Sequence, residues 1–228
     1  MRKPLKTDAL KKIIEIGMPV ETVVDVGILT GTSELMTVYK HCKQLLIEPI
    51  VEWNEAIIKN YSKLGIDFDL VNVAAAEKDG KMALELSSIK KDTSITHARL
   101  SENPTGGRIR EVEVRSVASL VKEKALKGPY LVKIDVDGAE LRVLEGVKDI
   151  ADEVSVIIIE VQVRNFLDRM NAVCKLGFQL FDIVDICYYS GRLNQMDLVF
   201  LNDSLVEKYK LDMFSNTFDY NLWETFKP

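Results

Sequence analysis

The sequence predicts an α/β fold: a mostly parallel sheet of about seven strands, with helices on both faces and an antiparallel last strand. Short β-branched runs alternate with amphipathic stretches through the first third of the chain, as expected for parallel strands joined by crossover helices. The most apolar run, residues 154–162, suits a central strand that is buried on both faces. The 228 residues, 47% hydrophobic and 29% charged, suit one soluble domain with its own core.

Each element follows from a local pattern. Residues 7–17 place apolar side chains at helical spacing and end at Gly17-Met18-Pro19, which stops a helix. Buried strands are expected where β-branched and apolar residues cluster, at 23–27, 45–48, 68–76, 130–138 and 154–162. Helices are expected at 34–40, 51–62, 117–126, 139–147 and 163–176. A closing pair of strands is expected at 178–186 and 196–202.

The middle of the chain has a different pattern. Residues 81–87 and 110–117 alternate apolar and polar side chains, so we expect two strands that pair at an edge. Residues 88–110 between them are polar and contain Gly and Pro, which predicts a loop excursion or lid. The expected layout is an N-terminal helix at 1–20, the main domain at 21–202 and an aromatic C-terminal tail at 203–228.

The composition argues against several kinds of partner. The formal net charge is -5 and basic residues are interleaved with acidic ones, so nucleic acid is not expected as a partner. Cys42, Cys174 and Cys187 are widely separated, form no metal-binding spacing and suit reduced thiols in the cytosol. The N-terminus lacks an uninterrupted apolar segment, and the longest apolar run is too short to cross a bilayer. We therefore expect a cytoplasmic protein without membrane insertion.

A glycine turn follows the first predicted strand, in the segment Asp25-Val26-Gly27-Ile28-Leu29-Thr30-Gly31. Gly27 and Gly31 allow a tight turn and let a ligand approach the main chain. The helix that begins near Ser33 directs its free N–H groups into the same space. Ligands of parallel sheets bind at the carboxyl ends of the strands, where Asp25 is placed to accept a hydrogen bond from a cationic amine.

Glu48 ends the second strand, 23 residues beyond Asp25. An acidic residue at about this spacing accepts the hydroxyls of a ribose, and the alternative is a solvated glutamate at a strand end. A dinucleotide site needs G-x-G-x-x-G to bring a helix against a pyrophosphate, and residues 26–33 lack that pattern. The D-x-G-x-x-x-G spacing fits a ligand without a pyrophosphate, so a nicotinamide-dependent oxidoreductase is only the second hypothesis.

The segment LVKIDVDGAELRVLEGV at 131–147 resembles the strongest signature of FkbM-type methyltransferases, K-I-D-V-E-G-x-E-x-x-V-L-x-G. DVGILTG (25–31), IEP (47–49) and VAAAEKDGK (73–81) are similar to further blocks of that family, and the likeness covers roughly residues 20–202. The resemblance implies a Rossmann-like class I methyltransferase fold. It also implies that S-adenosylmethionine is the cofactor and that a hydroxyl of a small molecule, sugar, glycan or natural product is methylated. Under this resemblance, the cofactor site includes Pro49, Ala74, Ala75 and Asp135 besides the turn and Glu48.

The sequence departs from the family pattern at a few positions. The usual Ala-Asn pair of the glycine turn is Ile28-Leu29 here, which removes a polar group beside the cofactor. Asp137 and Glu77 replace the common Glu and Asp, and both changes conserve the charge. A non-catalytic module that keeps the fold is therefore a third hypothesis.

Catalytic candidates follow from the chemistry of methyl transfer. Alignment of donor and acceptor is the main requirement, and a hydroxyl acceptor also benefits from a base or a cation. Asp135 ends the fourth strand, and Glu160 and Gln162 end the fifth, so adjacent strand ends bring together three oxygen ligands that suit a divalent ion such as Mg²⁺. His97 is either a base on a lid or a solvated loop histidine. Arg164 and Arg192 either neutralise an acidic acceptor or are solvent-exposed residues without a role in the site.

The tail carries Tyr209, Phe214, Phe218, Tyr220, Trp223 and Phe226. It is expected to pack over the domain, to line the acceptor pocket or to contact another subunit, since exposed aromatic patches mark interfaces. A homo-oligomer is therefore one of the expected arrangements.

Overall fold

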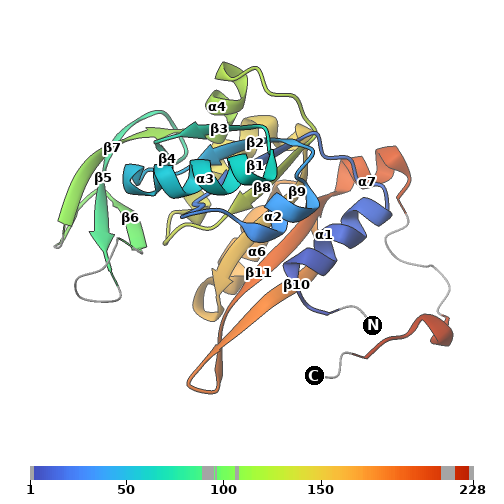
Figure 1. The fold of residues 1–228 in the computed structure, drawn as a ribbon. Coiled ribbons are helices and arrows are strands. Elements are labelled where there is room, and N and C mark those ends of the chain that lie inside the picture. Colours follow the sequence, from blue (N-terminus) through green and yellow to red (C-terminus); the bar gives the residue numbers. More distant parts are fainter. Residues whose placement is uncertain (1–2, 89–94, 96, 106–107, 212–218, 226–228) are drawn as a thin grey trace.

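A computed structural model of the chain describes residues 3–88, 95, 97–105, 108–211 and 219–225. Within these residues the centre is a seven-stranded sheet in the order β10-β11-β9-β8-β1-β2-β3 (Figure 1). Neighbouring strands are parallel except at β11, which runs antiparallel to both β9 and β10. The predicted fold class and the single antiparallel strand near the end of the chain are confirmed. The strands of this sheet are β1 (Thr22–Val26), β2 (Lys43–Ile47), β3 (Phe68–Val71), β8 (Tyr130–Ile134), β9 (Val154–Gln162), β10 (Phe178–Tyr189) and β11 (Arg192–Asn202).

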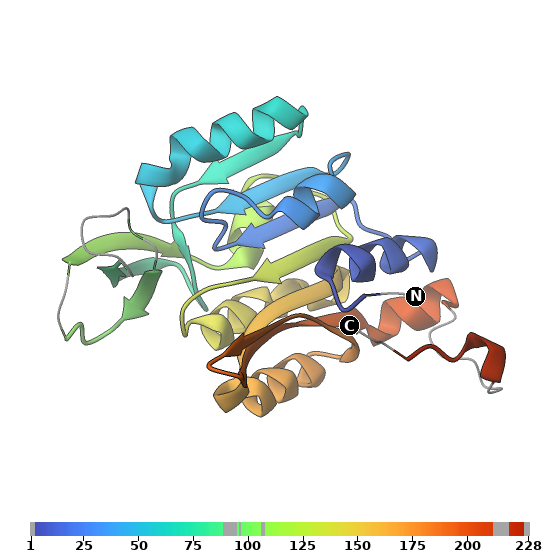
Figure 2. The ribbon, with the colours of Figure 1, turned by 60° about the horizontal axis from the view of Figure 1, so that its bottom comes forward.

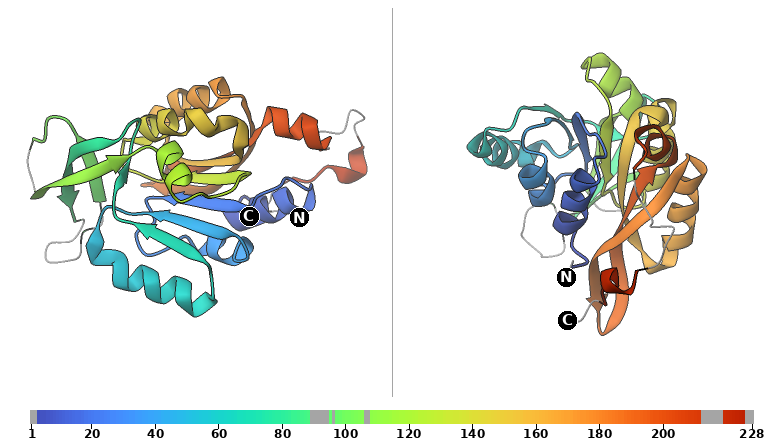
Figure 3. Two further views of the ribbon diagram at one scale, coloured as in Figure 1. Left: turned by 90° about the horizontal axis from the view of Figure 1, so that it is seen from above. Right: turned by 90° about the vertical axis from the view of Figure 1, so that its right-hand side faces the viewer.

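Helices cover both faces of this sheet (Figure 3). The helices α4 (Val117–Glu123), α5 (Glu140–Val147) and α6 (Phe166–Lys175) pack on one face. The other face is covered by α1 (Lys6–Glu15), α2 (Ser33–Val38), α3 (Asn54–Leu64) and α7 (Asp203–Tyr209). Short stretches of 3-10 helix occur at η1 (Val51–Trp53), η2 (Lys148–Glu153), η3 (Val163–Asn165) and η4 (Tyr220–Leu222).

Alternation along the strands decides which side chains reach which face. In β1, Val24 and Val26 join the core beneath α4, α5 and α6, whereas Val23 joins the core beneath α1 and α2. Asp25 therefore points to the α1 side of the sheet, and so does its register partner Lys133 on β8. These two charged residues share the face with the buried Asp197 of β11, which also acts on Lys133.

A second sheet, four-stranded within the described residues, stands beside the first in the order β4-β7-β5-β6 (Figure 2). The predicted edge pair is confirmed, since β5 (Gly80–Ser87) pairs with β7 (Arg108–Arg115) in antiparallel fashion. The prediction of a loop over 88–110 was wrong in part, because β6 (His97–Ser101) pairs with β5 in this segment. Apolar Ala98 and Leu100 pack on the core of the second sheet and explain why a strand forms there. The lid role of 88–110 stays a prediction.

The run 68–76, expected as one strand, is divided between the sheets. β3 ends at Val71, and β4 (Ala74–Ala75) pairs with β7 instead. Between them the Asn72 side chain donates to the backbone oxygen of Glu48 and to Asn54 Oδ1. These hydrogen bonds hold the chain where it leaves the first sheet, at the edge where the site forms.

The described elements nearest the two ends of the chain, α1 and η4, lie on the side away from the second sheet (Figure 2). The N-terminal helix is confirmed as α1. In the tail, Tyr209, Tyr220 and Trp223 are exposed, so these three side chains do not meet the expectation that the tail packs on the domain. Phe214, Phe218 and Phe226 lie outside the described residues, and a contact with another subunit stays a prediction. No described helix is both long enough and apolar enough to span a membrane.

Candidate functional site

The carboxyl ends of β1, β2, β8 and β9 border two adjoining cavities. The glycine-turn cavity, of about 380 Å³, is lined by Gly27, Leu29, Glu48, Pro49, Ile50, Ala98, Asp135, Val136, Asp137, Glu160, Gln162 and Gln195. The arginine cavity, of about 510 Å³, is lined by Arg99, Val136, Asp137, Gly138, Glu140, Glu160, Gln162, Arg164, Asn165 and Arg169. Four lining residues are common to both, so the two cavities form one cleft at the edge where ligands bind in parallel sheets.

Gly27 shapes the glycine-turn cavity. Its φ is +78°, and a Cβ at this position would lie 1.9 Å from the backbone oxygen of Asp135. The N–H of Gly27 donates to Ile47, while the N–H of Asp135 donates to Val26. A side chain at Gly27 would therefore push β8 away from β1 and would also fill the floor of the cavity.

Gly31 serves the core and does not line the cavity. Its φ is +131°, and a Cβ there would lie 2.9 Å from Met36 Sδ and 3.1 Å from the Tyr61 ring. Ser33 begins α2 as expected, but its hydroxyl donates to Glu34 at 3.1 Å on the surface. The expected ligand contacts of Gly31 and Ser33 are thus not among the residues that line the cleft.

Leu29 occupies the position at which the family usually has asparagine. Its φ is +53°, in the left-handed region that asparagine tolerates better than leucine. Its N–H donates to Glu48 Oε2 at 2.9 Å, and its side chain is 44% exposed in the mouth of the cavity. The turn therefore keeps its shape despite the departure.

Glu48 is the acidic group best placed for a ribose. It is buried, and its two oxygens accept separate N–H groups, Oε2 from Leu29 at 2.9 Å and Oε1 from Ile50 at 3.0 Å. Each carboxylate oxygen has a second lone pair, so both still accept a hydroxyl from a ligand in the cavity. Burial raises the pKa of Glu48 to about 7, although the two backbone N–H groups oppose this shift.

An apolar recess continues the glycine-turn cavity between the two sheets. Pro49, Ala74 and Ala75, which the resemblance assigned to the cofactor site, line it together with Leu84, Ala98 and Leu100 of the second sheet. Apolar walls suit a heteroaromatic ring, and the ribose position at Glu48 lies at the adjoining end. The Glu48 carboxylate suits a ribose, whereas the recess, at about 40 Å³, has to widen to admit an adenine ring.

Asp25 lies beneath the cleft and not on its lining. It is fully buried, and its two carboxylate oxygens have no hydrogen-bond partner among the described residues. The Lys133 ammonium lies 3.5 Å from Asp25 Oδ1 and 3.0 Å from Asp135 Oδ2. Burial lowers the pKa of Lys133, but the two neighbouring carboxylates outweigh this and raise it above its usual value. Lys133 therefore carries a positive charge under the donor end of the cleft.

Glu160 lies where the two cavities meet, with Asp135 and Gln162 on the same lining. Burial raises the pKa of Glu160 to about 7, and the negative charges of Asp135 and Asp197 add to the shift. Gln195 Nε2 donates to Glu160 Oε1 at 2.9 Å, which fixes the carboxyl group. The three expected oxygen ligands thus share one cavity. No group of three or more His, Cys, Asp or Glu side chains suited to a metal ion occurs in the part of the chain that is described.

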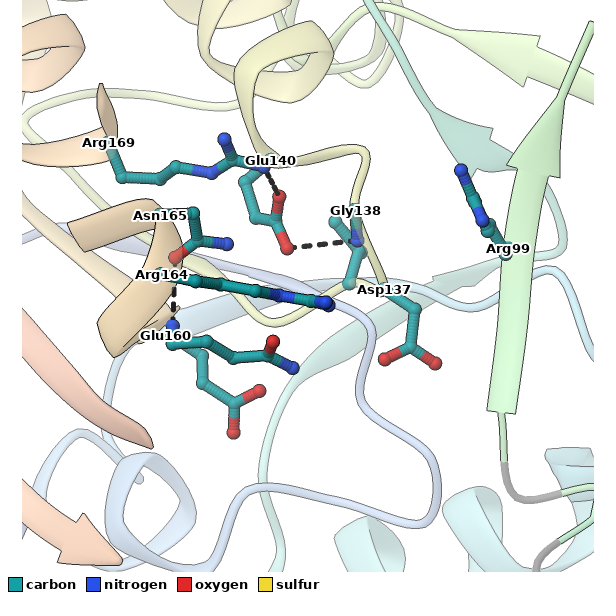
Figure 4. A pocket seen from close by; sticks show the side chains of 10 residues that line it. Arg99, Asp137, Gly138, Glu140, Glu160, Arg164, Asn165 and Arg169 are labelled. Atoms are coloured by element: carbon teal, nitrogen blue, oxygen red, sulfur yellow. Dashed lines mark hydrogen bonds and ion pairs between the residues drawn. The ribbon is translucent and has the colours of Figure 1, made fainter. Parts of the chain in front are cut away.

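The arginine cavity has walls from both sheets, and Figure 4 shows Arg164 and Arg99 approaching it from opposite sides. Arg169 Nη2 donates to Glu140 Oε2 at 2.7 Å, and Glu140 Oε1 accepts the N–H of Gly138 at 3.0 Å. Neither Arg99 nor Arg164 has an ion pair or hydrogen bond among the described residues. His97 begins β6 beside this cavity, but its side chain lies outside the described residues.

Sequence reasoning missed several lining residues. Gln195 faces the site because β11 pairs with β9 so that Gln195 lies opposite Gln162. Ala98 and Arg99 reach the cleft on β6, a strand that the polar composition of 88–110 concealed. Arg169 could have been found from its position in the first turn of α6, seven residues beyond the expected strand end at Gln162. The alternating pattern at 97–101 was the signal for β6.

Comparison with known proteins gives a family and a fold. A family model described as "Methyltransferase FkbM domain" matches residues 25–184. No sequence among curated proteins matches this chain. An rRNA methylase from Streptococcus thermophilus has a similar structure, with a TM-score of 0.50 and 12% sequence identity over 89% of this chain and 98% of that one.

Two other structural matches are weaker. A precorrin-6y C5,15-methyltransferase from Geobacter metallireducens GS-15 has a TM-score of 0.46 and 9% identity over 88% of this chain and 90% of that one. A fibrillarin pre-rRNA processing protein from Methanococcus jannaschii has a TM-score of 0.49 and 10% identity over 82% of this chain and 68% of that one.

Proposed function

The chain belongs to the FkbM methyltransferase family, and from this premise we propose that it methylates a hydroxyl oxygen of a small molecule, sugar or glycan. It is an S-adenosylmethionine-dependent methyltransferase with a Rossmann-like fold. The observation that carries the oxygen acceptor is the position of Glu160, a partly buried carboxyl group with a pKa of about 7 between two cavities.

The glycine-turn cavity and its apolar recess are assigned to the cofactor. The Glu48 oxygens accept the ribose hydroxyls, and the recess between Pro49 and Ala75 takes the adenine ring. The backbone at Gly27 allows close approach at the turn. The Asp135 carboxylate on the lining contributes negative charge on the donor side, which suits a ligand with a cationic amine and a sulfonium.

The arginine cavity is assigned to the acceptor, since it adjoins the cofactor cavity across Glu160. S-adenosylmethionine supplies an electrophilic methyl group when bound, and transfer to a hydroxyl releases one proton. The ionised Glu160 carboxylate accepts that proton, and Gln195 holds the carboxylate in place. The Asp135 carboxylate lies on the same lining, where its negative charge offsets the positive charge that develops on the attacking hydroxyl oxygen. His97 is the alternative base that the sequence predicted.

A divalent cation at Asp135, Glu160 and Gln162 stays part of the hypothesis, and the sequence argument from hard oxygen ligands supports it. The donor set contains two carboxylates and one amide, and one Glu160 oxygen already accepts Gln195. The proton transfer to Glu160 is therefore proposed without a cation. Activity measured with and without a chelator separates the two routes, because transfer by Glu160 alone is insensitive to chelation.

The test begins with the product S-adenosylhomocysteine, followed by methyl transfer to a panel of hydroxylated acceptors. We expect a saturable rise in melting temperature with S-adenosylhomocysteine and none with NAD(H). We also expect labelled methyl groups to appear on oxygen, as alkali-stable ethers, in at least one acceptor. Absence of any thermal shift, or product found only as methylated nitrogen or carbon, refutes the proposal.

A further inference from the structure

We propose that the acceptor carries an anionic group, a phosphate or a carboxylate, and that Arg99 and Arg164 bind it in the arginine cavity. The inference rests on the proposed function, because it assigns the substrate class of the same cleft. A sugar phosphate or a sugar acid has the required combination of an anionic group and a free hydroxyl.

The charges of the cavity lead to this assignment. Of its three arginines, Arg169 is half-buried and is paired with Glu140, which is itself tied to the Gly138 N–H. Arg99 and Arg164 are exposed to the cavity, and neither forms an ion pair or a hydrogen bond with another described residue. Two guanidinium groups are therefore available, and a guanidinium is the group that binds phosphate and carboxylate through two parallel hydrogen bonds.

The positions of the two arginines match a ligand that spans the cavity. Arg164 comes from η3, directly after the end of β9, whereas Arg99 comes from β6 of the second sheet. Figure 4 shows the two side chains on opposite sides of the space above Asp137 and Gly138. Glu160 lies on the same lining, so an anion held by the arginines leaves the rest of the ligand beside the proton acceptor.

The acidic side chains of the cavity do not cancel this field. Glu140 is already paired with Arg169, and Glu160 already accepts a hydrogen bond from Gln195. Asp137, the third carboxylate of this lining, also takes part in an interaction. The arginine cavity thus keeps two cationic groups for a ligand. The glycine-turn cavity beside it is lined instead by the carboxylates Glu48 and Asp135.

The competing occupant of these arginines is the carboxylate of the cofactor's methionine part. The experiment separates the two because it measures each ligand by itself. Calorimetry first gives the dissociation constant of S-adenosylhomocysteine for the wild type, Arg99→Gln, Arg164→Gln and the double variant. Inorganic phosphate, glucose 6-phosphate, glucuronate and neutral glucose are then titrated into each S-adenosylhomocysteine complex. Arg108→Gln is the matched control, since Arg108 is an exposed arginine on β7 outside the cleft.

We expect each single variant to weaken glucose 6-phosphate or glucuronate binding by about tenfold, because one charge-assisted pair is lost. The double variant is expected to lose saturable anion binding. Arg108→Gln is expected to bind the anions as the wild type does, and all variants are expected to keep the wild-type affinity for S-adenosylhomocysteine. Preference for the phosphate or the carboxylate probe identifies the source of the anion. The proposal is overturned if no anion binds, if the double variant binds as well as the wild type, or if the variants weaken S-adenosylhomocysteine instead. A wild type that fails to bind S-adenosylhomocysteine refutes the proposed function separately.

Discussion

The left-handed backbone at Leu29 leads to a quantitative prediction about the glycine turn. A residue with a Cβ in this region is strained by about 1–2 kcal/mol. Asparagine tolerates the region better, so Leu29→Asn relieves part of that strain while it keeps the N–H that Glu48 accepts. The substitution also removes apolar contact, and this loss is limited because the Leu29 side chain is 44% exposed.

Leu29→Ala separates the two effects, because alanine loses the contact but keeps the strain. Burying a whole leucine is worth roughly 1.5–3 kcal/mol, so losing about half of that burial destabilises the alanine variant by about 1 kcal/mol. We expect Leu29→Asn to be close to the wild type, and thus about 1 kcal/mol more stable than Leu29→Ala. For a chain of this length the two variants then differ by about 2–4 °C in melting temperature. Urea unfolding at fixed pH measures the difference, and equal destabilisation of both variants refutes the strain argument.

Three further predictions concern charged groups. Glu160→Gln removes the proton acceptor, so turnover falls by about 10²–10⁴-fold, and the rise of wild-type kcat/KM through pH of about 7 disappears; an unchanged pH profile contradicts the role. Glu48→Gln exchanges one acceptor oxygen for a donor, so calorimetry is expected to show S-adenosylhomocysteine binding weakened by about tenfold with the fold retained. The pKa of Glu48 is raised from 4.5 to about 7, so the folded state binds its proton more tightly. Its contribution to stability is thus complete below pH of about 4.5, and it is lost as pH rises to about 7. Denaturant unfolding of Glu48→Gln should lack that loss. Lys133→Met leaves the Asp25 carboxylate buried without a counter-charge and destabilises the protein by about 3–5 kcal/mol; adding Asp25→Asn should restore most of the loss.

The sequence predicted the elements whose pattern is local and continuous. The apolar runs of β1, β2, β8 and β9 carry buried side chains on both faces, so these strands were readable, and Gly27 marked the end of β1. The cofactor side of the cleft followed from the same elements, because Gly27 and Glu48 stand at strand ends. These residues act through backbone geometry and burial, which the sequence expresses within a few positions.

The acceptor side depends on contacts between distant segments, which one sequence does not express. Arg99 reaches the cleft only because β6 pairs with β5, and the polar residues around β6 suggested a loop. Gln195 reaches Glu160 through the register of β11 against β9, which depends on the long β10-β11 hairpin. Asp25 was expected at the cofactor, but strand alternation turns it to the face that carries Lys133. For each of these side chains, the choice of neighbouring strand and its register determine where the side chain points.

The ion pairs of Lys6 have a consequence for the limits of the catalytic unit. Lys6 lies in α1, where its ammonium is 2.5 Å from Asp197 and 3.2 Å from Asp185. Asp197 stands opposite Glu160 in the sheet and helps to set its pKa. Lys6, Asp197 and Gln195 all fall outside the segment 25–184 that defines the family. The proposed proton acceptor Glu160 thus lies inside the shared segment, while Asp197, which helps to raise its pKa, lies outside it. A relative without this aspartate is expected to have a lower pKa at the matching carboxyl group.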